Sequence, residues 1–157
     1  MLSLEVTYQI AETCLCLHVQ RAGRVVARHV DDVFRPLDLT NGQFAMLLTL
    51  HQAAPVAVGD LARRLTMDPS TAAANLKPLE RRGLVASRSH ATDGRVRLVA
   101  LTGIGRTVLA DAIERWMAAD DRASRGLSGG QVRALCFALR RLSTTRPTSK
   151  GFFGQIS

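Results

Sequence analysis

The chain has 157 residues, 46% of them hydrophobic, and a formal net charge of +8. This length is enough for one substantial core, or for a small domain with an added helical layer. Charges interrupt every apolar run well before the ~20 residues of a membrane span, and the first residues lack a secretion signal, so we expect a cytoplasmic protein without a membrane partner. Most of the positive charge is arginine, which favours an anionic polymer as partner because guanidinium groups pair bidentately with phosphates.

The N-terminal third carries apolar residues at helical spacing from about residue 10 to residue 37, which predicts one long helix. At about 25 residues it exceeds the usual length in globular proteins, so we expect it to pack against several neighbours or against a second chain. Thr40 is expected to cap a second, mostly buried helix over Asn41–Gln52. Residues 55–59 are expected to form a short extended link.

The middle of the chain predicts two helices joined by a turn. Residues 60–65 form the first helix, residues 66–68 the turn, and the second helix starts near Pro69, which suits a first helical turn. Pro78 is expected to bend this second helix without ending it.

After Gly83 the apolar period changes from 3.6 to 2, which predicts strands. Residues 84–88 and 96–101 are expected to pair as a hairpin with its tip at residues 89–95. Helix, turn, helix and hairpin is the order of a winged helix-turn-helix, whose second helix enters the major groove of DNA.

The outward surface of the second helix is predicted to contact DNA. Leu76 and Leu79 are expected to point inward with Leu84, which leaves small, polar and basic residues outside. Small residues let a helix approach base edges, hydroxyl and amide groups reach bases or phosphates, and basic side chains hold phosphates. The predicted contacts are Ser70, Thr71, Ala74, Asn75, Lys77 and Arg81. For Arg81 and its neighbour Arg82, the alternative is a solvated helix end that suits the helix dipole.

The hairpin tip, with the turn signal Asp93-Gly94, is predicted to act as a wing. Arg95 would enter the minor groove, whose narrow A·T-rich form attracts arginine, and Arg97 would add a second DNA contact. Asp93 is expected to orient an arginine near the base of the wing, because a carboxylate facing phosphate would be repelled. A solvated loop is the alternative.

Two stretches resemble the MarR family of bacterial transcription regulators. Residues 75–85, Asn-Leu-Lys-Pro-Leu-Glu-Arg-Arg-Gly-Leu-Val, resemble its recognition helix and the strand that follows. Residues 93–105, Asp-Gly-Arg-x-Arg-Leu-Val-x-Leu-Thr-x-x-Gly, resemble its wing and the start of its long fifth helix. The resemblance covers nearly the whole chain. It implies an obligate, triangular homodimer on palindromic double-stranded DNA, and repression that is released by a small ligand or an oxidant.

The expected fold is mainly α with a small β-hairpin wing, an α+β arrangement of a winged helix-turn-helix and a helical dimerisation layer. Residues 1–37 and 103–146 would form the dimerisation region, residues 38–102 the DNA-binding domain, and residues 147–157 a tail. Thr102 is expected to cap a helix over residues 103–123, and Ser128 with Gln131 fits a capping box for the last helix. Both helices carry more apolar surface than one winged-helix unit needs, which favours a dimer.

Three cysteines raise the question of redox sensing. Cys14 and Cys16 lie two apart on the predicted long helix, so their side chains would point about 200° apart and would not bond to each other. Cys16 falls where the organic-peroxide-sensing branch of the resembled family carries its reactive cysteine. That branch has tyrosines near its thiol, whereas this chain has Gln20, Asn41 and Phe44 there. The alternative role of Cys16 is that of a small buried apolar residue. If the thiol is a redox switch, Cys136 is the candidate resolving partner across the dimer.

A small-molecule effector is the other route to regulation, with His18 and Arg21 as candidate contacts for an anionic aromatic compound. No zinc spacing or C-x-x-C pair occurs, so we expect no metal and no cofactor. An enzyme would have to be a thiol peroxidase using Cys16, because no other catalytic pattern is present, and we expect none. The third alternative is a winged-helix module that binds proteins instead of DNA. The high density of arginine argues against it.

Overall fold

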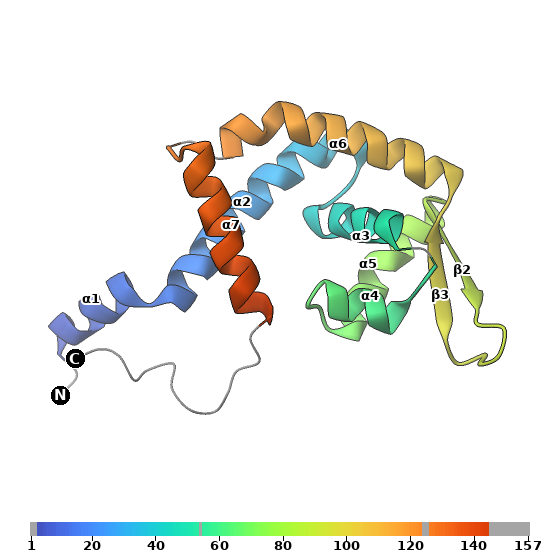
Figure 1. The fold of residues 1–157 in the computed structure, drawn as a ribbon, viewed down its shortest axis with the longest axis horizontal. Helices are drawn as coiled ribbons and strands as arrows, with labels where there is room; N and C mark the ends of the chain where they lie inside the picture. The colour runs from blue at the N-terminus through green and yellow to red at the C-terminus, as the bar shows by residue number, and fades with distance from the viewer. Residues whose placement is uncertain (1–2, 54, 124–125, 145–157) are drawn as a thin grey trace. The chain divides into compact units, whose positions relative to one another are not determined.

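The computed structural model describes residues 3–53, 55–123 and 126–144. The chain divides into two compact units, Met1–Ala123 and Ser124–Ser157. The described part of the first unit holds helices α1 to α6 and a small sheet of strands β1 to β3, and the second unit holds α7 (Figure 1). A mainly helical fold with a β-hairpin wing was predicted and is confirmed.

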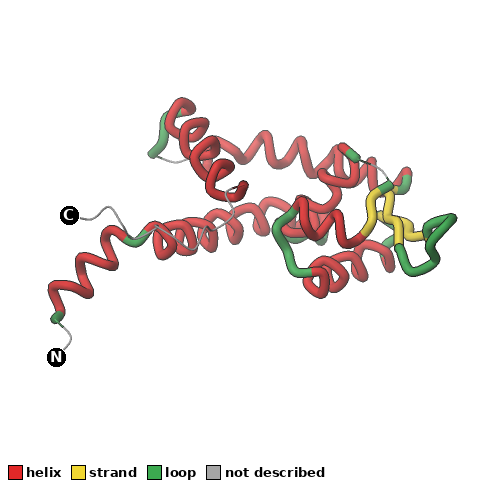
Figure 2. Tube along the Cα trace, turned by 60° about the horizontal axis from the view of Figure 1, so that its bottom comes forward, coloured by secondary structure: helices red, strands yellow, loops and turns green. Residues whose placement is uncertain are grey.

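The N-terminal segment is two helices, so the prediction of one long helix is wrong. Helix α1 spans Leu4–Thr13 and α2 spans Leu15–Phe34, followed by the 3-10 turn η1 at Arg35–Leu37. Figure 2 shows the step between α1 and α2 as a short loop. Cys14 occupies it with extended backbone angles, φ −72° and ψ 103°.

The hydrogen bonds around Cys14 explain the break. The Cys14 amide still closes α1 by donating to the Ile10 carbonyl at 2.8 Å, and the Cys14 carbonyl opens α2 by accepting from the His18 amide. In a continuous helix the Glu12 carbonyl would accept from the amide of residue 16. Here it accepts from Nε2 of His18 at 2.8 Å, so a side chain replaces the lost backbone bond.

Helix α3 spans Asn41–Gln52, as predicted, and its start is fixed by a capping box. The Gln43 amide donates to the Thr40 hydroxyl at 3.2 Å, and the Thr40 amide donates to the Gln43 side chain at 3.0 Å. Together these bonds satisfy two donors that a helix terminus otherwise leaves unpaired. The buried side of α3 packs against the end of α2, where the ring centroids of Phe34 and Phe44 are 4.5 Å apart.

The expected extended link, residues 55–59, is confirmed over strand β1, but residues 58 and 59 already belong to the next helix. Strand β1, Val56–Ala57, pairs antiparallel with β3, Arg97–Leu101, and places Val56 opposite Val99. Helix α4, Val58–Arg64, therefore begins two residues earlier than predicted. Strand β2, Val85–Ser89, pairs with the other edge of β3, so the predicted two-stranded hairpin is part of a three-stranded sheet in the order β1-β3-β2.

Helix α5 spans Pro69–Arg81 and continues through Pro78, which confirms one helix over this stretch. Leu76, Leu79 and Leu84, predicted to point inward, are each no more than 2% exposed. They join a core to which α2, α3, α4, α6 and the sheet also contribute. Its largest fully buried members are Phe34, Met46, Leu47, Leu50, Leu61, Leu76, Leu79, Val99 and Leu109.

Helix α6 spans Gly103–Ala123 and begins at the base of the hairpin (Figure 1). The Thr102 hydroxyl donates to the Gly83 carbonyl at 2.6 Å and accepts from the Gly105 amide at 3.0 Å, which confirms Thr102 as the cap. The Thr102 amide donates to the Leu84 carbonyl at 3.1 Å. Thr102 thus connects the start of α6 to Gly83 and Leu84, in the segment between α5 and β2.

In the second unit, α7 spans Gly129–Thr144. The capping box predicted before it is present, because Ser128 and Gln131 exchange side-chain bonds of 2.8 and 3.3 Å with each other's amides. The predicted tail, residues 147–157, lies outside the described residues. Among the described helices, none is long and apolar enough to cross a membrane.

Candidate nucleic-acid interface

Helix α5 presents most of its predicted DNA-contacting residues to solvent. Ala72, Leu76 and Leu79 are buried and fix the orientation of the helix. On the other side, the exposed residues are Ser70, Thr71, Ala74, Lys77 and Arg81. Asn75 is half-buried, and its amide nitrogen donates to the Thr71 carbonyl at 3.0 Å, so one of its two donor hydrogens is used within the helix. The helix therefore offers hydroxyls and two cations on one side.

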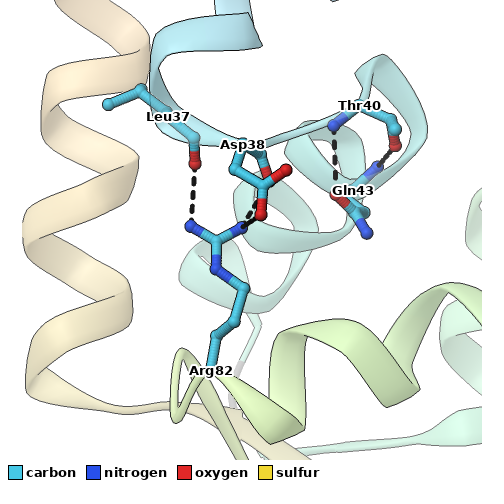
Figure 3. A network of polar contacts seen from close by, with 5 residues as sticks. All are labelled: Leu37, Asp38, Thr40, Gln43 and Arg82. Carbon is cyan, nitrogen blue, oxygen red and sulfur yellow. Dashed lines mark hydrogen bonds and ion pairs between the residues drawn. The ribbon is translucent and has the colours of Figure 1, made fainter.

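The two arginines at the end of α5 have different environments. Arg81 is exposed, whereas the Arg82 guanidinium bonds to the backbone of the α2–α3 junction (Figure 3). It donates to the Leu37 carbonyl at 2.7 Å and to the Asp38 carbonyl, and lies 3.7 Å from the Asp38 carboxylate. Asp38 has a left-handed backbone, with φ 49° and ψ 46°. Arg82 is thus a structural clamp between α5 and the start of α3.

The hairpin tip is ordered by bonds to its own backbone. The Asp93 carboxylate accepts from the Arg95 amide at 3.0 Å, and the amides of His90 and Val96 donate to the carbonyls of Val96 and Asp93 at 2.8 and 3.0 Å. The Arg95 residue is exposed at the tip. Asp93 therefore acts on the backbone of the neighbouring arginine and shapes the turn that presents it.

A different carboxylate holds the arginine at the base of the wing. Glu80, in the last turn of α5, accepts hydrogen bonds from the Arg97 guanidinium and from the Ser87 hydroxyl. Burial raises the pKa of Glu80, but the bonds from Arg97 and Ser87 and the positive charge of Arg97 outweigh it and lower this pKa overall. Glu80 does not stand out in the sequence, because its partners lie beyond Gly83, on strands that no helical spacing relates to α5.

The candidate effector and redox residues lie around the α1–α2 step. Cys14 is half-buried and Cys16 is exposed, with its sulfur accepting from Nε2 of Gln20 at 3.2 Å. Since Cys14 lies outside both helices, the expected angle between two cysteines on one helix does not apply. His18 is engaged by the Glu12 carbonyl, and Arg21 is exposed.

Two further side chains that could react or bind a ligand are Cys136 and His29. Cys136 is exposed on α7, in the second unit. His29, on α2, was not singled out from the sequence, yet its Nε2 atom is shielded from solvent and has no hydrogen-bond partner among the described residues. No group of three or more metal-ligating side chains occurs in the described ranges.

Comparison with known sequences identifies relatives along most of the chain. The model of the MarR family matches residues 39–96. The HTH-type transcriptional repressor Rv2887 of Mycobacterium tuberculosis is 32% identical over 126 residues, which cover 79% of this chain and 89% of that protein. The organic hydroperoxide resistance transcriptional regulator of Bacillus subtilis is 25% identical over 103 residues, or 66% of this chain and 70% of that protein.

Comparison with solved structures finds the same fold. The transcriptional repressor CouR bound to a 23-mer DNA duplex superposes with a TM-score of 0.78 at 27% identity, covering 85% of this chain and 95% of that one. CouR from Rhodococcus jostii bound to p-coumaroyl-CoA gives 0.73 at 26%, with coverage of 89% and 97%. With its winged helix-turn-helix and a repressor relative along most of its length, this chain belongs to the MarR family.

Proposed function

We propose that this protein is a homodimeric transcriptional repressor that binds a palindromic DNA duplex, with one α5 helix and one wing per half-site. The observation that carries the proposal is that two elements with exposed basic side chains, α5 and the wing, share one hydrophobic core. Lys77 and Arg81 are exposed on α5, and Arg95 is exposed at the wing tip. The relatives named above are transcriptional regulators, and none is named as an enzyme.

The proposed division of labour on DNA follows from side-chain chemistry. Ser70, Thr71, Ala74 and Asn75 lie in the first half of α5, up to its middle, and their small side chains would allow close approach to base edges in the major groove. Lys77 and Arg81 would hold phosphates, which fixes the register of the helix but carries no sequence information. Arg95 would enter the minor groove, presented by the turn that Asp93 stabilises.

The proposed dimer accounts for apolar surface that the described chain leaves uncovered. Large hydrophobic residues are exposed on α1, α2 and α6, with Tyr8 at 69%, Val25 at 58% and Met117 at 68%. Exposed apolar surface on neighbouring elements marks an interaction site in a water-soluble protein. A second copy related by a two-fold axis would cover it within the dimerisation region, residues 1–37 and 103–146, and would impose a palindromic operator.

The proposed signal that releases DNA is a small anionic molecule or oxidation of a thiol. One structural neighbour is described as bound to p-coumaroyl-CoA, and one relative is named for organic hydroperoxide resistance. In this chain, the exposed Cys16 with its neighbours Cys14, His18 and Arg21 would form the responding segment. Thiol oxidation needs an accessible sulfur, which Cys16 has. Cys136 of the second copy would be the resolving thiol.

Selection of bound fragments from a random duplex library, with and without a mild organic peroxide, tests this function. We expect a palindrome whose half-sites are centred about 10–10.5 bp apart, or a multiple of that spacing. Arg95→Ala should weaken binding to the selected duplex by about tenfold or more, because a specific arginine contact contributes about 1–3 kcal/mol. Arg24→Ala, which removes the same charge from an exposed position on α2, is the matched control once gel filtration shows that its oligomeric state equals that of the wild type.

The outcomes separate the alternatives. Binding that is lost on oxidation and retained by Cys16→Ser identifies a redox-switched repressor, whereas equal binding in both conditions directs the search to small anionic ligands. Peroxide turnover by the purified protein that disappears in Cys16→Ser would identify a thiol peroxidase. Absence of binding to any duplex at low salt would leave the winged helix as a protein-interaction module.

A further inference from the structure

We propose that Glu80 is a positioning residue for DNA binding, which fixes the wing against the recognition helix α5 through Ser87 and Arg97. This inference rests on the proposed function, because it assigns a task in DNA binding to a contact within the DNA-reading unit. It also assigns Arg97 a new role: instead of contacting DNA, Arg97 on β3 binds the Glu80 carboxylate.

The contacts tie one helix to both strands of the wing. The same carboxylate oxygen, Oε1 of Glu80, accepts from the Ser87 hydroxyl on β2 and from the Arg97 guanidinium on β3. In the register of the sheet, Ser87 lies opposite Val99, and Ser89 lies opposite Arg97. Ser87 and Arg97 are therefore diagonal neighbours on one face of the hairpin, within reach of a single acceptor.

The direction of Arg97 follows from the strand period. Residues 97 and 99 point to the same face, because side chains alternate along a strand. Val99 is 0% exposed, so this face is turned toward the helical core. The Arg97 side chain is 47% exposed and that of Glu80 is 23% exposed, which places their ion pair at the edge of the core. Arg95, in contrast, lies beyond the last β2–β3 pair, at the tip.

Apolar packing does not fix the outer part of the wing. On β2, only Val85 is buried, and the four residues from Ala86 to Ser89 are exposed. Beyond Val85, the strand is held by its ladder to β3 and by the bond from Ser87 to Glu80. Strand β1 pairs only with residues 98 and 99 of β3, so from Arg97 to the tip the hairpin is two-stranded. A two-stranded hairpin is marginally stable in water, so a polar contact to the helix can set the angle of this part of the wing.

Because Glu80 is negatively charged, a positioning role and simple repulsion predict opposite changes in DNA affinity when the charge is removed. A carboxylate on a DNA-reading surface repels phosphate, so electrostatics alone predicts that its removal strengthens binding. If Glu80 positions the wing, its removal must weaken binding in spite of that repulsion. A purely repulsive role would not produce weaker binding, and general destabilisation would not confine faster hydrogen exchange to the wing.

The test compares Glu80→Gln, which keeps the shape of the side chain, with Asp38→Asn as the control, because the Asp38 carboxylate is 93% exposed and lies outside the wing and the proposed dimerisation region. In the absence of DNA, the backbone amides of residues 85–101 should exchange hydrogen several-fold faster in Glu80→Gln than in the wild-type protein. On the duplex selected with the wild-type protein, it should weaken binding roughly three- to tenfold, the range for a part-exposed charge-assisted hydrogen bond. The control should change neither quantity.

Arg97→Gln and the double variant, Glu80→Gln with Arg97→Gln, test whether Arg97 acts through Glu80 or contacts DNA itself. If Arg97 acts through Glu80, Arg97→Gln should weaken binding by a similar factor and leave the slope of log K against log salt unchanged. The double variant should then be no weaker than either single variant, since both remove one interaction. A slope reduced by about 0.9 for each lost phosphate contact would instead make Arg97 a DNA contact.

The outcomes distinguish this inference from the function on which it rests. Tighter or unchanged DNA binding by Glu80→Gln, with wild-type protein that binds the duplex, overturns the positioning role. Unchanged exchange in residues 85–101 overturns the contact itself. If exchange speeds up as expected but the wild-type protein binds no duplex, the contact stands and the proposed function fails.

Discussion

The close approach of α6 to the start of β2 makes Gly105 a sensitive position. A Cβ atom at Gly105 would lie 1.9 Å from the Leu84 carbonyl oxygen and 2.9 Å from its carbonyl carbon. These are backbone atoms, so no side chain can rotate aside to make room. To reach a separation of 3.0 Å, the carbonyl oxygen would have to withdraw by about 1.1 Å. The same oxygen accepts the Thr102 amide that begins α6.

The expected cost of Gly105→Ala is worked from three contributions. Forcing a methyl group into a packed contact costs about 1–3 kcal/mol, and loss of the Thr102 hydrogen bond costs about 1 kcal/mol. The better helix propensity of alanine returns about 1 kcal/mol. The net destabilisation is about 2 kcal/mol, which for a chain of this size corresponds to a fall in Tm of roughly 4–8 °C.

Thermal and urea unfolding, followed by circular dichroism at one fixed protomer concentration, measure this effect. Gly23→Ala on α2 is the matched control, because no atom lies within 4 Å of a Cβ built there. The control should raise the free energy of unfolding by up to about 1 kcal/mol. An equal or higher stability of Gly105→Ala would refute the reasoning, since the same substitution in two helices is expected to have opposite signs.

Three further substitutions and conditions test contacts described above. Arg82→Lys should lower the free energy of unfolding by about 1–2 kcal/mol in urea, because an ammonium cannot replace a fork that binds two carbonyls, while Arg81→Lys should stay within about 0.5 kcal/mol. Thr40→Ala should cost about 1 kcal/mol in the same assay, and Thr40→Ser should restore most of it. The lowered pKa of Glu80 means that its stabilisation of the wing is complete above the usual value of 4.5 and is lost as pH falls through the lowered pKa. Hydrogen exchange in the wing, corrected for intrinsic rates, should show this acid-side loss in the wild type but not in Glu80→Gln.

The sequence predicted the elements whose boundaries are set by neighbouring residues. Helix α3 has both members of its capping box within four residues, and α6 and α7 are likewise opened by Thr102 and Ser128. Helix α5 was placed by Pro69 at its start and by inward leucines, which are buried as expected. Local signals of this kind do not depend on the rest of the fold.

The features that the sequence did not reveal depend on distant partners. Strand β1 has two residues, too few for a period, and exists because β3 lies beside it. The break at Cys14 has no proline or glycine to mark it, and the bond from the His18 ring to the Glu12 carbonyl across it joins residues six apart, outside any helical spacing. Glu80 was hidden for the same reason, since its position in α5 is an ordinary one and its partners are 7 and 17 residues away.

The clamp formed by Arg82 has a consequence for how the α2–α3 junction tolerates substitution. Because Arg82 binds the carbonyls of Leu37 and Asp38, it recognises the course of the backbone and not the identity of the side chains. The Asp38 side chain is 93% exposed, so its charge contributes little. Asn or Gly, which accept a positive φ, should therefore replace Asp38 freely, whereas a β-branched residue would break the grip of an arginine 44 positions away. At this junction, the contact with Arg82 requires a positive φ at residue 38 and not a particular side chain.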